Sequence, residues 1–251
     1  MPTVNCHWIT ELDWHEISGE TFILKDCVDV CYIRISSLIQ KIGKLSEFLQ
    51  EDERTRAFRY HHEKDRIRFQ ISRGALKLIL SKYLQILPAS LQLFIGKNKK
   101  PFVHVPSGLP LQYNITHSED CILVAISNAQ VGIDVEKIDS QFVYSDILPS
   151  NFSREESKFV QEGANPRENF YLLWTRKESM VKASGKGMDE NFMNVPSLTG
   201  IHQIEELTIG SGEDWSIGSF RINHQYLGAV AHPIYIRNLR FWNADSIIQT
   251  T

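Results

Sequence analysis

Hydrophobic and polar residues alternate along the chain in patterns that predict strands and helices in its first part. Residues 31–35 alternate in character, as a strand does when one of its faces is buried. Between about residues 46 and 80 the apolar positions recur at helical spacing, and His61-His62 marks a bend between two helices. The first part therefore combines an early strand with a long helical region, which Pro88 is expected to end.

Strand-like segments follow a cluster of chain-breaking residues at 106–110. Residues 111–115, 121–126 and 131–138 are rich in apolar and β-branched side chains. Residues 127–130 have the composition of a turn. We therefore expect the last two of these segments to pair as a hairpin.

A second helical region follows and has clear limits in the sequence. Ser153 and Glu156 have the Ser-x-x-Glu spacing of a capping box, which predicts a helix start. Pro166 precedes a further helix that is expected to run to Ser184, where Gly185 stops it. The last 60 or so residues alternate in the manner of antiparallel strands.

Helices and strands thus occur on both sides of the breaker cluster. A chain of 251 residues is long enough for one large core or two smaller ones. We predict an α+β fold with two comparable lobes, residues 1–108 and residues 109–251.

Composition excludes several classes of protein. The net charge is −3 and 23% of the residues are charged, which fits neither a disordered chain nor a general nucleic-acid binder. No segment has the form of a signal peptide or reaches the roughly 18 apolar residues of a membrane-spanning helix. We therefore expect a cytoplasmic protein that binds neither nucleic acid nor membrane.

The cysteines give no clear metal site. They are Cys6, Cys27, Cys31 and Cys121. Only Cys27 and Cys31 are close in sequence, and neither a second pair nor a pair of histidines accompanies them. A zinc site needs about four ligands, so we expect four reduced thiols.

Two carboxylates in the segment Gly132-Ile-Asp-Val-Glu136 are the first candidates for chemistry. Side chains alternate along a strand, so Asp134 and Glu136 point to the same face. Neighbouring carboxylates repel unless something positive lies between them, and Mg²⁺ prefers oxygen ligands. The motif fits a magnesium site, but it also fits a strand with one solvated face.

The helix before Gly185 carries a second candidate. Trp174, Glu178 and Lys182 are spaced by four residues and share one helix face. An exposed Glu–Lys pair would explain two of them. Trp174 indicates that the face is partly buried, and the turn Gly185-Lys-Gly187 would suit the close approach of a phosphate.

Two loops add weaker candidates. His117 and Ser118 end the segment 114–118, where an imidazole and a hydroxyl could meet an anion, although a lone histidine is more often structural. Residues 99–102 read Lys-Lys-Pro-Phe, which a solvated basic turn would also explain.

The order of these motifs carries more information than any one of them. In chain order they are Lys-Pro-Phe (100–102), Asn-Ile-Thr-His-Ser (114–118), Gly-Ile-Asp-Val-Glu (132–136), Phe-Ser (152–153) and Trp-Thr-x-Lys-Glu-x-x-x-Lys-Ala-x-Gly-Lys-Gly (174–187). This series resembles the Sfp-type 4′-phosphopantetheinyl transferases over about residues 50–232. The resemblance includes the arginine-rich segment 56–73 and the segment Ala-Val-Ala-His-Pro at 229–233.

The resemblance implies a fold and an activity. It implies two similar lobes with pseudo-two-fold symmetry, coenzyme A in the cleft between them, and action as a monomer. The implied enzyme is a holo-[acyl-carrier-protein] synthase, which transfers 4′-phosphopantetheine from coenzyme A to a serine of an apo acyl or peptidyl carrier protein and releases 3′,5′-ADP. The carrier is expected to contact the segment 142–152.

The resemblance also implies roles for individual residues. Asp134, Glu136 and Glu178 would bind Mg²⁺, or Mn²⁺ in its place, and Glu178 would also be the general base. Lys182 would stabilise the leaving group and contact phosphate. The remaining implied contacts to coenzyme A are Arg56, Lys100, Pro101, His117, Ser118 and Lys177, with Arg68 and Arg73 as further candidates for the 3′-phosphate.

Other functions remain compatible with the sequence. A coenzyme A-dependent acyltransferase, or another phosphate-transfer enzyme, would not need both Asp134 and Glu136. A non-catalytic module that binds coenzyme A would tolerate the loss of Glu178.

Overall fold

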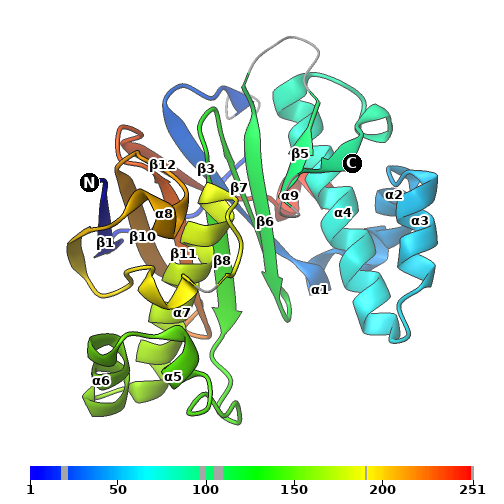
Figure 1. The fold of residues 1–251 in the computed structure, drawn as a ribbon. Coiled ribbons are helices and arrows are strands. Elements are labelled where there is room, and N and C mark those ends of the chain that lie inside the picture. The colour runs from blue at the N-terminus through cyan, green and yellow to red at the C-terminus, as the bar shows by residue number, and fades with distance from the viewer. Residues whose placement is uncertain (18–21, 97–99, 105–109, 190, 250–251) are drawn as a thin grey trace.

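The main elements of the described chain are two five-stranded sheets and two long helices (Figure 1). The computed structural model describes residues 1–17, 22–96, 100–104, 110–189 and 191–249. Mixed α and β structure was the predicted class, and the structure has it. Within the described parts of the chain, none of the helices combines the length and apolar character that crossing a bilayer requires.

Sheet one carries most of the strands from the second part of the chain. Its order is β8 (Gly132–Lys137), β11 (Tyr226–Pro233), β10 (Trp215–Ile222), β1 (Thr3–Trp8) and β9 (Gly200–Gln203). All neighbours are antiparallel except β1 and β10, which run parallel.

Sheet two carries β2 (His15–Glu16), β12 (Asn238–Asn243), β3 (Cys27–Arg34), β7 (Cys121–Ser127) and β6 (Gln112–Ser118), in that order. A separate two-stranded ribbon joins β4 (Leu93–Ile95) to β5 (Pro101–Val103).

The helices are mostly short, with two long exceptions. The helices that precede β4 are α1 (Ile35–Leu38), α2 (Ile42–Glu47), α3 (Glu51–Phe58) and α4 (Glu63–Leu84), with the 3₁₀ turns η2 (Ile39–Lys41) and η3 (Pro88–Ser90). The helices that follow β8 are α5 (Leu148–Asn151), α6 (Arg154–Glu162), α7 (Pro166–Ser184), α8 (Glu206–Ile209) and α9 (Asp245–Gln249), with the 3₁₀ turn η5 (Phe192–Asn194).

Apolar side chains packed between the layers hold them together. Helix α4 covers one face of sheet two, where Ile71 and Ile79 pack against Ile33 and Ile122. Helix α7 covers one face of sheet one. The other faces of the two sheets pack against each other, through side chains such as Val30, Ile133, Phe220 and Val230. The two sheets therefore share a core and form one body, with a long helix on each outer side (Figure 1).

Several sequence predictions are confirmed. The chain bends at residues 59–62 between α3 and α4, and the Ser153–Glu156 capping box starts α6. Helix α7 ends at Ser184, and Gly185 follows in the left-handed conformation with φ 73°. All four cysteines are buried free thiols.

The predicted hairpin at residues 127–130 is wrong. Strand β7 pairs with β3 and β6 in sheet two, whereas β8 pairs with β11 in sheet one. The turn residues are present, but here they carry the chain from one sheet to the other. A local turn signal does not record which sheet the next strand joins.

The predicted boundary between residues 108 and 109 lies outside the described residues. Strands β6 and β7, which follow it, belong to sheet two with β3, and β1, which precedes it, belongs to sheet one. Neither sheet is thus built from one side of that boundary alone. That residues 1–108 and 109–251 are separate folding units stays a prediction.

Candidate active site

The two sheets meet along the strands β6 and β8, and side chains of β6 join them. The Asn114 amide oxygen accepts a hydrogen bond from the Ile133 backbone N–H at 2.9 Å. The Thr116 hydroxyl donates to Asp134 Oδ1 at 3.0 Å, and the Ser118 hydroxyl donates to Glu136 Oε2 at 3.0 Å. Every second residue of β6 thus faces β8, and the two candidate carboxylates of β8 lie at this seam.

Helix α7 brings two further charges to Asp134. Lys182 Nζ lies 2.6 Å from Asp134 Oδ1 and 3.5 Å from Glu178 Oε2, so the ammonium joins the strand to the helix. Burial by itself would lower the pKa of Lys182, but the two carboxylates outweigh it and raise that pKa. Burial raises the pKa of Glu178, an effect that Lys182 partly offsets. The sharing of one face by Glu178 and Lys182 is confirmed.

Glu136 lies in an environment that disfavours its charge. Burial, followed by repulsion from Asp134, raises the pKa of Glu136 to about 7, while the hydrogen bond from Ser118 acts in the opposite direction. Crowded, half-buried carboxylates of this kind are stabilised by a cation. They are also typical of functional sites.

The carboxylate of Asp134 provides a test of whether a metal ion fits here. This residue is 2% exposed, its Oδ1 accepts hydrogen bonds from Thr116 and Lys182, and its buried Oδ2 has no hydrogen-bond partner in the part of the chain that the structure describes. A buried carboxylate oxygen left without a partner is costly, and binding a cation would satisfy it. Among the described residues no three acidic, histidine or cysteine side chains already form a group that could hold a metal. Lys182 provides the positive charge between Asp134 and Glu178 in this structure.

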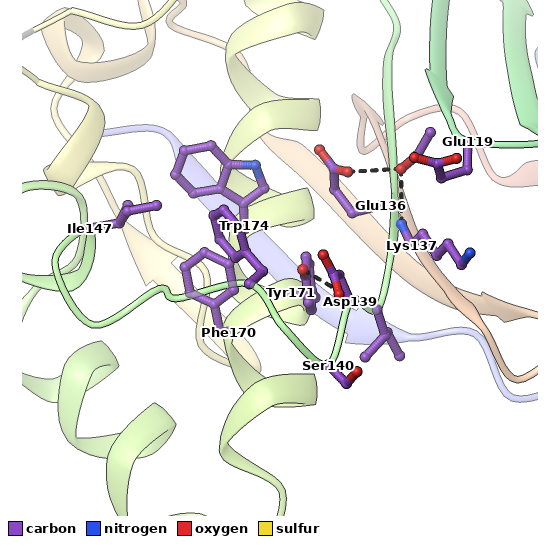
Figure 2. Close-up of a pocket in the computed structure, with 12 residues that line it drawn as sticks. Glu119, Glu136, Lys137, Asp139, Ser140, Ile147, Phe170, Tyr171 and Trp174 are labelled. Carbon is purple, nitrogen blue, oxygen red and sulfur yellow. Dashed lines mark hydrogen bonds between the residues drawn. The ribbon is translucent and has the colours of Figure 1, made fainter. Parts of the chain in front are cut away.

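A pocket of about 650 Å³ opens beside Glu136 (Figure 2). One wall is the face of α7 that carries Phe170, Tyr171 and Trp174, and another is the loop that follows β8. Trp174 is half-buried and stacks on Phe170 with ring centroids 5.9 Å apart, which confirms the predicted partial burial of its face. The pocket beside Glu136 is thus both aromatic and acidic.

His117 lies on the opposite face of β6 from Thr116 and Ser118. Partial burial, together with the nearby charges of Arg68 and Lys182, lowers the pKa of His117. Arg68 is bound to Asp65 of its own helix at 2.7 Å. The alternation of β6 therefore separates His117, which faces α4, from Ser118, which faces β8.

Two arginines on the α3–α4 side share one aromatic ring. The guanidinium groups of Arg56 and Arg73 lie 5.2 Å and 5.6 Å from the centre of the Phe69 ring. Arg73 is also bound to Glu53 at 3.2 Å, whereas exposed Arg56 has no acidic partner among the described residues. Of the two, Arg56 keeps its charge available to an anion.

Pro101 begins the strand β5 and Lys100 directly precedes it, while Lys99 lies outside the described residues. Lys100 Nζ donates to the carbonyl oxygen of Ala183 at 2.5 Å, at the C-terminal end of α7. Burial lowers the pKa of Lys100 to about 8. The ribbon is thereby tied to α7 rather than standing apart as a solvated basic turn.

The structure does not support Lys177 as a contact to coenzyme A. Its side chain is fully buried, with Nζ 2.9 Å from Glu156 Oε2 and 2.8 Å from the carbonyl oxygen of Met193. Neighbouring positions on a helix are rotated by about 100°, so Lys177 faces away from the side of α7 that carries Glu178. This lysine anchors the helix instead.

The Gly185-Lys-Gly187 turn is also different from the prediction. The Lys186 ammonium donates to the carbonyl oxygens of Leu207 and Thr208 and lies 3.1 Å from Asp189. Its charge is therefore used within the protein, and the turn does not offer a free cation to a phosphate.

Thr116 is a site residue that the sequence reasoning did not single out. Its hydroxyl binds the central carboxylate, Asp134. The available signal was the two-residue period of a strand, which places Thr116 and Ser118 on the face opposite to His117.

Two family models match adjacent parts of the chain. Residues 38–129 match the model described as 4′-phosphopantetheinyl transferase, N-terminal, and residues 130–231 match the 4′-phosphopantetheinyl transferase superfamily. Together they extend from α1 to β11 and include every candidate residue described above.

Individual relatives agree with these matches. The chain is 28% identical over 227 residues to 4′-phosphopantetheinyl transferase HetI of Nostoc, an alignment that covers 88% of this chain and 94% of HetI. It is 22% identical to 4′-phosphopantetheinyl transferase Sfp of Bacillus subtilis, over 82% of this chain and 92% of Sfp. A shorter alignment to slr0495 of Synechocystis has 31% identity and covers 56% of this chain and 58% of that relative. The chain belongs to the 4′-phosphopantetheinyl transferase family.

Proposed function

We propose that this protein transfers the 4′-phosphopantetheine group of coenzyme A to a serine of an apo carrier protein and releases 3′,5′-ADP. The observation that carries the proposal is the contact between α7 and the β8 side of the seam. There Asp134, whose buried Oδ2 has no partner among the described residues, lies against Lys182, and Lys182 in turn contacts Glu178. Family membership supplies the substrates, and the seam supplies groups suited to the reaction.

Asp134, Glu136 and Glu178 would hold Mg²⁺, or Mn²⁺ in its place. All three provide the oxygen ligands that these cations prefer. When bound, the ion would supply positive charge that offsets the negative charge developing on the phosphate groups during transfer. Thr116 and Ser118 hold two of the carboxylates in position by hydrogen bonds.

Glu178 and Lys182 carry the proton and charge work of the transfer. Glu178, half-buried on α7, would accept the proton of the carrier serine as its oxygen attacks the β-phosphorus. The bond from that phosphorus to the departing 3′,5′-ADP oxygen breaks, and the ammonium of Lys182 stabilises the charge left on ADP.

The anionic end of coenzyme A would lie on the α4 side of β6. Arg56 and His117 are exposed there, with Arg68 close to His117. Guanidinium groups bind phosphates in a bidentate manner. Lys100 and Pro101, at the start of β5, would contact the adenine end, and Ser118 would lie between this region and the metal.

Action as a monomer stays a prediction. Gel filtration with light scattering tests this, and a dimer mass at assay concentrations would contradict it. That the protein acts in the cytoplasm stays a prediction.

The direct test is to incubate the protein with coenzyme A, Mg²⁺ and several apo carrier proteins, and to weigh each carrier by mass spectrometry. The expected result is a gain of one phosphopantetheine group on at least one carrier. If no carrier gains mass while coenzyme A still binds in calorimetry, the protein is a binding module and the proposed transfer is wrong.

A further inference from the structure

The loop 138–147 leaves β8 directly after the candidate metal ligands and forms one wall of the pocket (Figure 2). It has no regular secondary structure before α5, and it presents apolar side chains outward. Phe142 is 39% exposed and Val143 is 68% exposed. Ordering a loop of this length costs roughly 1 kcal/mol or more per residue in backbone entropy, so specific contacts must hold it in place.

Arg167, in the first turn of α7, makes such contacts. Its Nη1 donates to two carbonyl oxygens of the loop, that of Asp139 at 2.6 Å and that of Phe142 at 2.8 Å. One guanidinium nitrogen carries two protons, so both bonds form together. The same guanidinium lies 5.5 Å from the centre of the Tyr144 ring. One side chain thus fixes the loop at three residues.

The aromatic face of α7 supports the loop from below. Tyr144 stacks on Phe170 with centroids 4.8 Å apart, and Phe142 lies 5.9 Å from the same ring. The Asp139 backbone N–H donates to the hydroxyl of Tyr171 at 3.3 Å (Figure 2). These contacts attach the loop to the helix that also carries Glu178.

Charge separates this wall from the region expected to bind phosphates. The pocket is lined by three carboxylates, Glu119, Glu136 and Asp139, and by one ammonium, Lys137. Arginine side chains lie instead on the α4 side of β6. A phosphate-bearing reactant is favoured on the arginine side, so the loop is left to meet the other reactant, the serine-bearing carrier protein.

We propose that Arg167 is a positioning residue that holds the loop 138–147 in the conformation that docks the carrier protein. The inference rests on the proposed transferase function. Arg167 does not touch the reacting groups. It orders the loop before the carrier binds, which lowers the entropy cost of docking the carrier and leaves the chemical step unchanged.

Steady-state kinetics of Arg167→Ala provide the first test. The KM for the carrier should rise by about tenfold, while kcat and the KM for coenzyme A stay within about twofold of the wild type. Arg167→Lys keeps a hydrogen-bond donor but loses the planar stack on Tyr144, so it should give an intermediate carrier KM. Arg154→Ala is the matched control, because Arg154 is an exposed arginine at the start of the preceding helix, α6.

Limited chymotrypsin digestion tests the loop without any transferase assay. Cleavage after Phe142 or Tyr144 should be at least several-fold faster in Arg167→Ala than in the wild type or in Arg154→Ala. A circular-dichroism melt of each variant checks that the fold is retained, and Tyr144→Leu provides a second variant that removes only the stacking contact.

The outcomes separate the two claims. A wild type that modifies no carrier overturns the proposed function and this inference with it. An active wild type whose carrier KM is unchanged in both Arg167→Ala and Tyr144→Leu overturns the role of Arg167 alone, even if the loop is cut faster. An equal rise in both KM values would also overturn it, because the damage would then not be specific to the carrier side.

Discussion

Helix pairs α3–α4 and α6–α7 are built on the same support but present different chemistry. In each pair a glutamate in the first turn of the short helix accepts the backbone N–H of the residue three positions earlier, Glu53 from Gln50 and Glu156 from Ser153, both at 2.9 Å. Each glutamate then pairs with a fully buried lysine of the long helix. The two Nζ–Oε2 distances are 2.6 Å for Lys77 and 2.9 Å for Lys177.

The two helix pairs differ in the charged side chains that they present around β6 and β8. The α3–α4 pair carries a group of arginines, among them Arg56 and Arg73 on the Phe69 ring. Helix α7 instead directs Glu178 and Lys182 to Asp134 at the seam. One device for anchoring a long helix thus serves a surface suited to phosphates in one case and a candidate reaction centre in the other. Substitutions on the α7 side should therefore lower kcat more than substitutions on the α3–α4 side.

The largest effect is expected from Asp134. Asp134→Asn keeps the size of the side chain but weakens metal binding, so kcat should fall by about a thousandfold or more. Calorimetric titration with Mn²⁺ should show weaker binding in the variant. Glu162→Gln, which changes an exposed glutamate of α6, is the control and should match the wild type. Retained activity in Asp134→Asn would refute the metal assignment.

The buried lysines Lys77 and Lys177 are expected to differ in their effect on kcat. Lys177→Met leaves the buried Glu156 without its charge partner, which should lower the free energy of unfolding by about 3–5 kcal/mol in urea denaturation. Lys77→Met should lower it less, because Glu53 keeps its ion pair with Arg73 at 3.2 Å. Only Lys177→Met should also lower kcat, because it loosens the helix that carries Glu178. If both variants lose the same fraction of kcat, the anchors do not act separately.

A double variant separates the charge of Glu156 from its other hydrogen bonds. Glu156→Gln combined with Lys177→Met removes both charges, so most of the lost stability should return. A double variant less stable than Lys177→Met alone would show that Glu156 acts mainly through its other bonds, to the backbone and hydroxyl of Ser197.

A smaller effect is expected on the α3–α4 side. Arg56→Ala should raise the KM for coenzyme A by about tenfold, because one phosphate contact is lost, and should leave the carrier KM unchanged. Dephospho-coenzyme A, which lacks the 3′-phosphate, tests which phosphate Arg56 contacts. The wild type should have a higher KM for it than for coenzyme A, whereas Arg56→Ala should have similar KM values for both. Arg59→Ala, a neighbouring exposed arginine, should behave as the wild type.

The smallest effect concerns two histidines of sheet one. Burial lowers the pKa of both His7 and His232 in the folded state. Below about pH 6.5 the unfolded chain binds protons that the folded chain refuses, so stability falls with falling pH by up to about 1.4 kcal/mol per pH unit for each histidine. Between pH 7.5 and 5.5, His232→Gln should lose less stability than the wild type. Equal slopes in urea denaturation would show that His232 contributes nothing.

The sequence allowed most of the local structure to be predicted, because helix caps and periodicity are local signals. The capping box at Ser153 and the stop at Gly185 are both present in the structure. The connection from β7 to β8 could not be predicted in this way, because pairing depends on contacts between distant residues. Partners of β8 come from β11, almost a hundred residues later.

The candidate site divides along the same line. The shared face of Glu178 and Lys182 follows from helical spacing alone and is present. The family resemblance implied Lys177 as a contact to coenzyme A, whereas the helix turns it away from the face that carries Glu178. Its partner Glu156 was already visible as part of a capping box, but the pairing depends on how α6 packs against α7.

Both sheets pair strands that are far apart in the sequence, which affects folding during synthesis. Strand β1 is synthesised some two hundred residues before its parallel partner β10, and β12 is the last described strand to join sheet two, between β2 and β3. The contact order is therefore high, which favours slow folding. A nascent chain would hold β1 and β3 with open edges until the last strands leave the ribosome, and that interval is when chaperones would matter most.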